Sequence, residues 1–178
     1  MYSGVLPLAA AALAIERLVY IWISRRPDTL ERLLSRWSLL SSAGAINVLA
    51  GLFGVFKVVQ LAVFFTWCGL YSRLQPSHSW PDYDAIVAGA LLIVGGQLLN
   101  LRVFHLLGRT GVFYGTRFGA QLPWRTDFPF SVMSHPQYVG ACMSVWGFFL
   151  VMRFPYDDWY VLPILETAYY AAGSVLER

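Results

Sequence analysis

The chain has 178 residues, of which 57% are hydrophobic, 16% aromatic and 13% charged, and its formal net charge is +3. With a mean hydropathy of +0.55, this composition excludes an ordinary soluble domain and indicates an integral membrane protein. The length suits one bundle of four or five helices, so we expect a single membrane-embedded domain over residues 1–178.

Hydropathy predicts five membrane helices, since a helix needs roughly 20 apolar residues to cross the hydrocarbon. In chain order they are Val5–Ile23, Ile46–Leu70, Ala85–Leu107, Pro136–Met152 and Trp159–Leu176. Glu16 and Arg17 interrupt the first apolar run and basic residues follow it, so we interpret it as a retained helix, not a cleaved signal. The predicted fold is an all-α, polytopic membrane bundle with a connecting segment on its cytosolic face.

The segment "RRPDTLERLLSRWSLL" joins the first two spans. It carries apolar side chains at helical spacing, namely Leu30, Leu33, Leu34 and Trp37. This pattern is typical of an amphipathic helix in the headgroup layer. A simple continuation toward the second span explains the segment equally well.

Arginines are concentrated on one side of this five-span topology. That side receives Arg25, Arg26, Arg32, Arg36, Arg102, Arg109, Arg117, Arg125 and Arg178, whereas the other loops hold Arg73 and Arg153. The positive-inside tendency places the basic side in the cytoplasm, together with the connection from Gly108 to His135 and with Glu177. A basic rim that binds anionic lipid would give the same asymmetry.

The run "LGRTGVFYGTRFG" places glycines at positions 108, 111, 115 and 119. On a helix these spacings would align the glycines into a smooth face for close helix packing. Alternatively, glycine lets a bound molecule approach the backbone closely. Both interpretations stay open here, as they do for Gly95 and Gly96 in "VGGQLLN".

Charged and sulfur-containing residues also occur inside the apolar segments. Lys57 and the Glu16–Arg17 pair are intramembrane charges, which are functional candidates by default, although snorkelling to the interface explains them equally well. Cys68 and Cys142 form no CxxC pair and resemble small buried hydrophobes. We therefore expect neither redox chemistry nor a metal site. We also expect no nucleic-acid partner.

Several motifs together resemble the phosphatidylethanolamine N-methyltransferase family of membrane enzymes. They are "LGRTGVFYGTRFG", "RTDFPF", "SHPQYVG" and the carboxylate of "VLER", and the resemblance is strongest over residues 107–140. The His-Pro-x-Tyr element is shared, more distantly, with isoprenylcysteine carboxyl methyltransferases. The resemblance implies methylation of a lipid amine by S-adenosylmethionine, with no metal.

The resemblance also implies site residues. The family's glycine element falls on Gly95 and Gly96, and the first member of its acidic pair on Glu177, whereas the second position is Arg178. The implied cofactor-binding residues are Gly95, Gly96, His135, Pro136, Tyr138, Gly140, Glu177 and Arg178. Glu177 and His135 are the catalytic candidates, and Tyr114, Arg117 and Arg125 are the substrate-binding candidates. Of these, the two arginines are best placed to bind the lipid phosphate at the headgroup level.

Each of these assignments has a plain structural alternative. His135 can be a helix cap, Glu177 a solvated carboxylate at a helix end, and Arg117 and Arg125 ordinary interface arginines. Tyr114, Tyr138 and Trp124 could hold a methylated ammonium by cation–π attraction, but the aromatic belt also explains Trp124. The substrate amine must lose a proton before attack, and Glu177, His105 or a water could accept it.

Three functions compete at this stage. The first is a phospholipid N-methyltransferase that acts on phosphatidylethanolamine and its mono- and dimethyl forms. The second is a related membrane methyltransferase that acts on an isoprenylcysteine carboxylate or another lipid, and the third is a non-catalytic scaffold. The first implies the endoplasmic reticulum membrane, with the site facing the cytosol, or alternatively a bacterial inner membrane.

Overall fold

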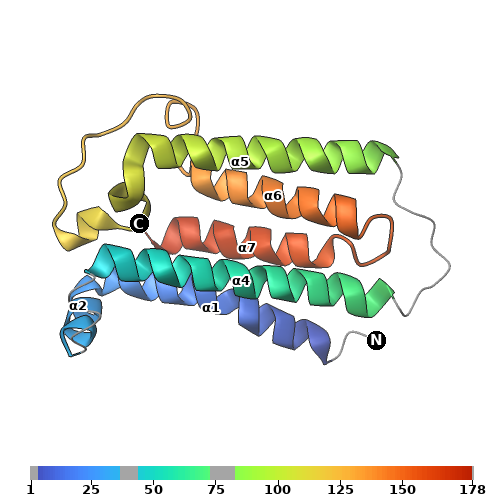
Figure 1. The fold of residues 1–178 in the computed structure, drawn as a ribbon, viewed down its shortest axis with the longest axis horizontal. Helices are drawn as coiled ribbons and strands as arrows, with labels where there is room; N and C mark the ends of the chain where they lie inside the picture. Colours follow the sequence, from blue (N-terminus) through green and yellow to red (C-terminus); the bar gives the residue numbers. More distant parts are fainter. Residues whose placement is uncertain (1–3, 37–43, 73–82, 178) are drawn as a thin grey trace.

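Five long helices run side by side along the long axis of the molecule (Figure 1). The structure is a computed structural model that describes residues 4–36, 44–72 and 83–177. The long helices are α1 (Val5–Arg25), α4 (Ala45–Ser72), α5 (Tyr83–Val112), α6 (Pro136–Met152) and α7 (Val161–Leu176). The short helix α2 (Pro27–Ser35) and the 3-10 turn η1 (Gly115–Phe118) complete the regular structure of the described residues. The all-α prediction is confirmed.

The observed helices follow the predicted spans closely. The fourth span matches α6 residue for residue, and the others differ by five residues or fewer at either end. Within the described part of the chain, α1, α4 and α5 are long and apolar enough to cross a membrane. Helices α6 and α7 are apolar but shorter, with 17 and 16 residues. The protein is therefore an integral membrane bundle.

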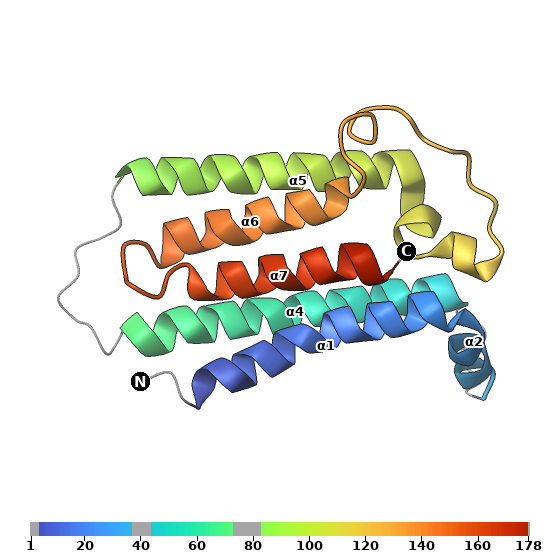
Figure 2. The same ribbon diagram turned by 180° about the vertical axis from the view of Figure 1, so that it is seen from behind.

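The packing order places α6 between α5 and α7, and α1 against both α4 and α7 (Figures 1 and 2). One end of the bundle holds α2, the bent end of α5 and the C-terminal end of α7 (Figure 1). At that end, Nε of Arg25 donates a hydrogen bond of 3.1 Å to the carbonyl oxygen of Leu176. Glu177 and the segment after α5 thus share one end, whose cytosolic location stays a prediction.

Paired glycines set the close approach of α5 and α6. A Cβ atom on Gly89 would lie 2.7 Å from the carbonyl oxygen of Gly147, and one on Gly140 would lie 2.6 Å from that of Gly96. Both distances are shorter than any tolerated carbon–oxygen contact, so a side chain at either position would push the helices apart. Gly96 and Gly140, two predicted cofactor residues, therefore have a packing role in this interface.

Helix α5 turns sharply at Gly108, which has φ 63° and ψ −177° (Figure 1). Only glycine adopts this conformation readily. The chain then passes through η1 to Gly119, which also has a positive φ of 81°. Of the two interpretations of glycines 108, 111, 115 and 119, the shared helix face is excluded, because positive φ at Gly108 and Gly119 breaks the helical path.

Helix α2 confirms the predicted amphipathic helix as a short element that begins at Pro27. Its Leu30 and Leu34 are buried in a cluster with Leu49 of α4 and Phe113, so its apolar face packs on the protein. Leu33 is exposed, and Trp37 lies outside the described residues. Helix α2 is separate from α1, because the helical path is interrupted at Arg26.

A buried ion pair lies in the turn between α6 and α7. Nε of Arg153 donates to Oδ1 of Asp158 at 2.9 Å, and its Nη2 donates to Oδ2 at 3.1 Å. Both side chains are only 2% exposed. The two parallel hydrogen bonds fix this turn at the end of the bundle opposite Glu177.

Candidate functional site

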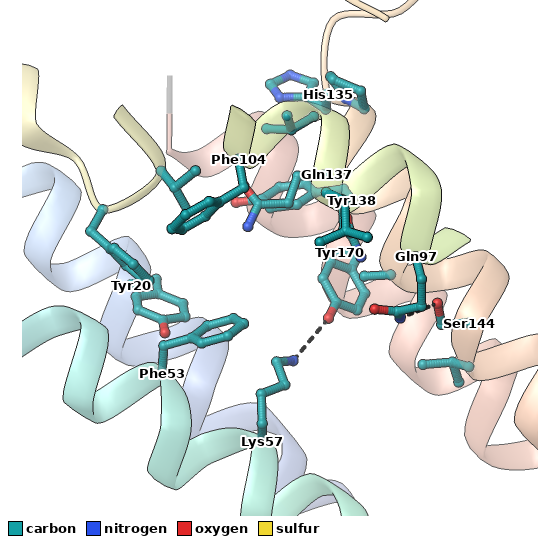
Figure 3. A pocket seen from close by; sticks show the side chains of 18 of the residues that line it. Tyr20, Phe53, Lys57, Gln97, Phe104, His135, Gln137, Tyr138, Ser144 and Tyr170 are labelled. Atoms are coloured by element: carbon teal, nitrogen blue, oxygen red, sulfur yellow. Dashed lines mark hydrogen bonds between the residues drawn. The ribbon is translucent and has the colours of Figure 1, made fainter. Parts of the chain in front are cut away.

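A cavity of about 710 Å³ lies between α1 and α4 on one side and α5, α6 and α7 on the other. Figure 3 shows Tyr20, Phe53 and Lys57 on one wall and Tyr138, Tyr170 and Gln97 on the facing wall. Five residues predicted from the sequence line this cavity: Tyr114, His135, Pro136, Tyr138 and Glu177. They come from three separate parts of the chain, namely the segment after α5, the start of α6 and the end of α7.

Glu177 is held by two phenols at the end of α7. Tyr114 donates a hydrogen bond of 2.6 Å to its Oε2 atom, and Tyr138 donates a second, shorter one to the same oxygen. Its other oxygen, Oε1, is buried and has no hydrogen-bond partner among the described residues. A solvated carboxylate would not be arranged in this way, since a buried acceptor without a partner carries a desolvation cost.

Local backbone geometry explains how these three side chains meet. The turn at Gly108 redirects α5, and Tyr114 itself has a left-handed backbone with φ 56° and ψ 28°. Such a conformation is unfavourable for a residue with a side chain, by roughly 1–2 kcal/mol. Pro136 occupies the first turn of α6, as predicted, and Tyr138 lies within that same turn.

Arg17 of α1 lies behind these phenols. It is 6% exposed and bound to Oε1 of Glu16 at 2.6 Å. Its guanidinium carbon lies 4.1 Å from the centre of the Tyr170 ring and 5.4 Å from that of Tyr138. Because cation–π contacts fix the aromatic planes as well as the arginine, this cation orients two rings that line the cavity.

A second polar network lies deeper in the bundle, around Lys57 of α4. Its ammonium donates to Oε1 of Gln60 at 2.9 Å, to the hydroxyl of Tyr170 at 3.3 Å and to Oε2 of Glu16 at 3.3 Å. Gln60 in turn donates to Glu166 at 2.7 Å. Lys57 and Glu16 were candidates as intramembrane charges, and the structure joins them in one network.

Sequence reasoning missed four residues of these networks: Tyr20, Gln60, Glu166 and Tyr170. Glu166 offered a signal, because it is an ionisable residue inside the last predicted span. Gln60 and the two tyrosines offered none, since polar and aromatic residues are common in such helices. Their roles depend on neighbours from other helices.

His135 caps the start of α6 with its backbone, and no hydrogen bond from its side chain caps the helix. Its ring stacks on that of Tyr138, with the centres 5.7 Å apart and the planes inclined by 16°. His135 thus lines the cavity next to Tyr138 (Figure 3). His105, one of the candidate proton acceptors, is exposed and lies outside the cavity lining.

The remaining predicted site residues lie outside the lining. Gly95, Gly96 and Gly140 lie on the α5–α6 side of the bundle, and Gly95 faces Met143. Arg125 is exposed, and Arg117 is exposed and donates a bond of 3.4 Å to the carbonyl oxygen of Glu177. Arg178 lies outside the described residues.

The chemical character of the cavity follows from these groups. The half-buried carboxylate of Glu177, the rings of several tyrosines and phenylalanines, and buried polar atoms of Tyr20 and Asn100 that have no hydrogen-bond partner among the described residues line a largely apolar space. Carboxylate and aromatic faces together favour an organic cation. Over residues 4–36, 44–72 and 83–177, no cluster of three or more His, Cys, Asp or Glu could hold a metal ion.

Comparisons with known proteins point to the same chemistry. Residues 85–178 match the sequence model of the phospholipid methyltransferase family. A phosphatidyl-N-methylethanolamine N-methyltransferase of Arabidopsis thaliana is 42% identical over 99 residues, which cover 56% of this chain and 54% of that protein. A phosphatidylethanolamine N-methyltransferase of Rattus norvegicus is 32% identical over 106 residues, which cover 58% and 52%.

A third relative, a phosphatidyl-N-methylethanolamine N-methyltransferase of Neurospora crassa, is 40% identical over 84 residues, covering 44% of this chain and 39% of that protein. The chain thus spans about half the length of the first two relatives. No solved structure matches the chain. The matched range begins in α5, so the wall of the cavity formed by α1 and α4 lies outside it.

Proposed function

Because the chain belongs to the phospholipid methyltransferase family, we propose that it methylates the amine of phosphatidylethanolamine or of its mono- and dimethyl forms. The donor in this proposal is S-adenosylmethionine, and residues 1–178 act as one domain. The names of the relatives support both the lipid class and the reaction. The observation that carries the proposal is the Glu177 carboxylate, whose buried Oε1 atom has no partner among the described residues, in a cavity walled by aromatic rings.

The residues present fit the proposed donor. S-adenosylmethionine supplies an electrophilic methyl group on a sulfonium and carries a ribose diol, an adenine and an ammonium. The free Oε1 atom of Glu177 can accept from hydroxyl or ammonium groups. The faces of Tyr114, Tyr138 and His135 offer surfaces for an aromatic base or a cation. We place the donor at this end of the cavity.

The acceptor amine needs to be neutral and held in line with the methyl group. Alignment of two reactants within one site is worth several kcal/mol of the barrier, roughly 7–11 kcal/mol in the best cases. The carboxylate and the aromatic faces attract the amine as a cation, and desolvation by the mainly apolar walls then shifts it toward the neutral form that can attack. Of the protein groups considered as proton acceptors, Glu177 lines the cavity whereas His105 does not, so we assign this role to Glu177.

The two other functions considered are methylation of a carboxylate and scaffolding without catalysis, and the assay described below distinguishes them from the proposed one. The proposal for a carboxylate acceptor rests on the shared His-Pro-x-Tyr element, and no observation in the cavity favours it over an amine. We place the enzyme in the endoplasmic reticulum membrane with Glu177 facing the cytosol, where the donor is available.

The test is an assay of the purified protein in lipid nanodiscs with S-adenosylmethionine labelled in its methyl group. Phosphatidylethanolamine, its mono- and dimethyl forms and a prenylated cysteine are offered separately. We expect label in the lipid amines and none in free ethanolamine, which lacks acyl chains that partition into the bundle. Label in the prenylated cysteine alone would transfer the assignment to carboxylate methylation, and no label in any acceptor would support a scaffold.

A further inference from the structure

A phospholipid brings a phosphodiester anion into the cavity with its amine. An anion taken out of water needs a cationic partner, because burial of an unpaired charge is very unfavourable. Arg117 and Arg125 were the cations predicted for this role, but both are exposed and neither lines the cavity. Among the described residues, the arginine and lysine that do line it are Arg17 and Lys57.

These two cations differ in how firmly they are held. The Arg17 side chain is 8% exposed, bound to Glu16 at 2.6 Å and covered by the Tyr170 ring. The Lys57 side chain is 28% exposed, and its ammonium lies 3.3 Å from both Glu16 and the Tyr170 hydroxyl. Lys57 is therefore the more accessible cation, and its contacts to Glu16 and Tyr170 are long enough to leave the ammonium free to bind a further anion.

We propose that Lys57 binds the phosphate of the phospholipid acceptor, assisted by the hydroxyl of Tyr170. Figure 3 shows the Lys57 side chain extending from α4 into the cavity toward Tyr170. Tyr170 accepts a hydrogen bond from Lys57, so its own O–H can donate to a phosphate oxygen. A charged donor and a neutral donor then converge on one anion. The inference rests on the proposed function, since it names the recognition of that lipid.

The position of Lys57 suits a zwitterionic headgroup. Tyr170 and Glu177 are seven residues apart on α7, which corresponds to roughly 10 Å along the helix axis. The cation therefore lies at the deeper level of the cavity and the Glu177 carboxylate at its end. A lipid with its phosphate at Lys57 directs its amine toward the level of Glu177 and the proposed donor.

The position of Lys57 also leaves a path out of the cavity for the acyl chains of the lipid. Leu61 of α4 and Leu101 and Phe104 of α5 line the cavity and are exposed by 47%, 65% and 48%. The cavity is thus bordered by exposed apolar side chains of α4 and α5. Chains attached to a phosphate at Lys57 can leave through this border without crossing polar groups.

The alternative is that Lys57 only neutralises Glu16 within the fold. Both roles can be separated by ligand binding, measured by titration calorimetry on the full chain in nanodiscs. The probes are dihexanoyl phosphatidylethanolamine and dihexanoylglycerol, which share acyl chains but differ in the phosphate and amine. The variants are Lys57→Gln, Lys57→Arg and, as a matched control, Arg32→Gln on the exposed surface of α2.

We expect Lys57→Gln to bind the phospholipid about tenfold more weakly, as expected for the loss of a charged hydrogen bond. Its affinity for dihexanoylglycerol and for S-adenosylhomocysteine should stay at the wild-type level. Lys57→Arg should keep most of the phospholipid affinity, and Arg32→Gln should match the wild type. Wild-type phospholipid affinity in Lys57→Gln, or an equal loss for both lipids, would overturn the proposal.

Two further measurements keep the test decisive. If Lys57→Gln does not fold, Tyr170→Phe is measured instead, because it keeps the ring over Arg17 and removes the hydroxyl. Its affinity for the phospholipid should fall, though by less than in Lys57→Gln, while its affinity for dihexanoylglycerol stays the same. Wild-type affinity for the phospholipid in Tyr170→Phe would count against the proposal. The labelled-donor assay is run separately on the wild type. A selective binding loss without methylation of any lipid would refute the proposed function but leave Lys57 as a phosphate site.

Discussion

Tyr114 and Glu177 are joined by a hydrogen bond of 2.6 Å although 63 residues separate them in the chain. The bond connects the start of η1 to the residue that ends α7, and Tyr138 of α6 donates to the same carboxylate oxygen. Three helices are thus fixed around one acidic group. The other oxygen of that group stays available to a ligand.

Glu177→Gln should weaken binding of S-adenosylhomocysteine by roughly 1–3 kcal/mol, because a charged acceptor in a partly dehydrated cavity is replaced by a neutral amide. Calorimetric titration of the purified protein measures this directly. Glu31→Gln, which changes an exposed carboxylate on α2, is the matched control and should bind as the wild type does. Equal affinity in Glu177→Gln and the wild type would assign Glu177 to structure alone.

Tyr114→Phe should reproduce part of the Glu177 effect, because it keeps the ring and removes one hydrogen bond to a charged group, worth about 1.5–3 kcal/mol. A double-mutant cycle for the affinity of S-adenosylhomocysteine with Glu177→Gln measures the coupling. We expect the double variant to lose less than the sum of the single losses. Strict additivity would mean that Tyr114 does not act through Glu177.

Gly96→Ala should destabilise the fold by about 1–3 kcal/mol, because the new Cβ atom meets the Gly140 carbonyl and the Ser144 side chain across the α5–α6 interface. Thermal unfolding followed by circular dichroism reports the loss. Gly51→Ala on α4 is the control, since nothing lies within 4 Å of its Cβ position. If Gly96→Ala melts with the wild type but loses cofactor affinity, the cofactor role predicted from the sequence gains support instead.

Asp158→Asn should reduce stability by about 3–5 kcal/mol, because it leaves the Arg153 cation buried with a neutral partner. The neighbouring Asp157→Asn changes an exposed carboxylate and should have little effect. Chemical denaturation of both variants in detergent gives the comparison. The Arg153–Asp158 pair lies at the end of the bundle opposite Glu177, so folded Asp158→Asn should bind S-adenosylhomocysteine as the wild type does. A loss of this affinity without a loss of stability would contradict the independence of the two ends.

Topology is tested with single cysteines in a chain that lacks Cys68 and Cys142. Thr126→Cys lies in the segment after α5, and Asp157→Cys lies in the turn between α6 and α7 at the other end of the bundle. A membrane-impermeant maleimide applied to sealed vesicles should label the two positions from opposite faces, with Thr126→Cys on the cytosolic side. Labelling of both positions from one face would refute the transmembrane arrangement.

The helices were predictable because each one carries its own signal. A long apolar run sets a membrane helix whatever its neighbours are, and Pro136 marks the start of α6 by local geometry. His135, Pro136, Tyr138 and Glu177 were named from the sequence because they lie within short motifs. The structure places them, with Tyr114, along one cavity, and their roles there stay predictions.

The rest of the site depends on contacts between helices, which a single sequence does not reveal. Gly96 was assigned to the cofactor from a local motif, but the structure shows its packing against Gly140, 44 positions later. Arg117 and Arg125 were chosen for the phosphate because of their expected place at the headgroup level, whereas Lys57 reaches the cavity from a helix outside the matched range. Which residues of different helices meet is decided by how the helices pack, and not by the spacing of residues in the sequence.

The buried charges also bear on how the chain enters the membrane during synthesis. Glu16 and Arg17 are neighbours on α1 and are bonded to each other, so this helix can insert as a neutral unit. Lys57 and Glu166 are each the sole charged side chain of their helices, and a lone charge at the bilayer centre raises the insertion free energy by about 2.5–3.5 kcal/mol. Translation delivers Lys57 after Glu16 and Glu166 after Gln60, so each late charge meets a partner that is already in the bilayer.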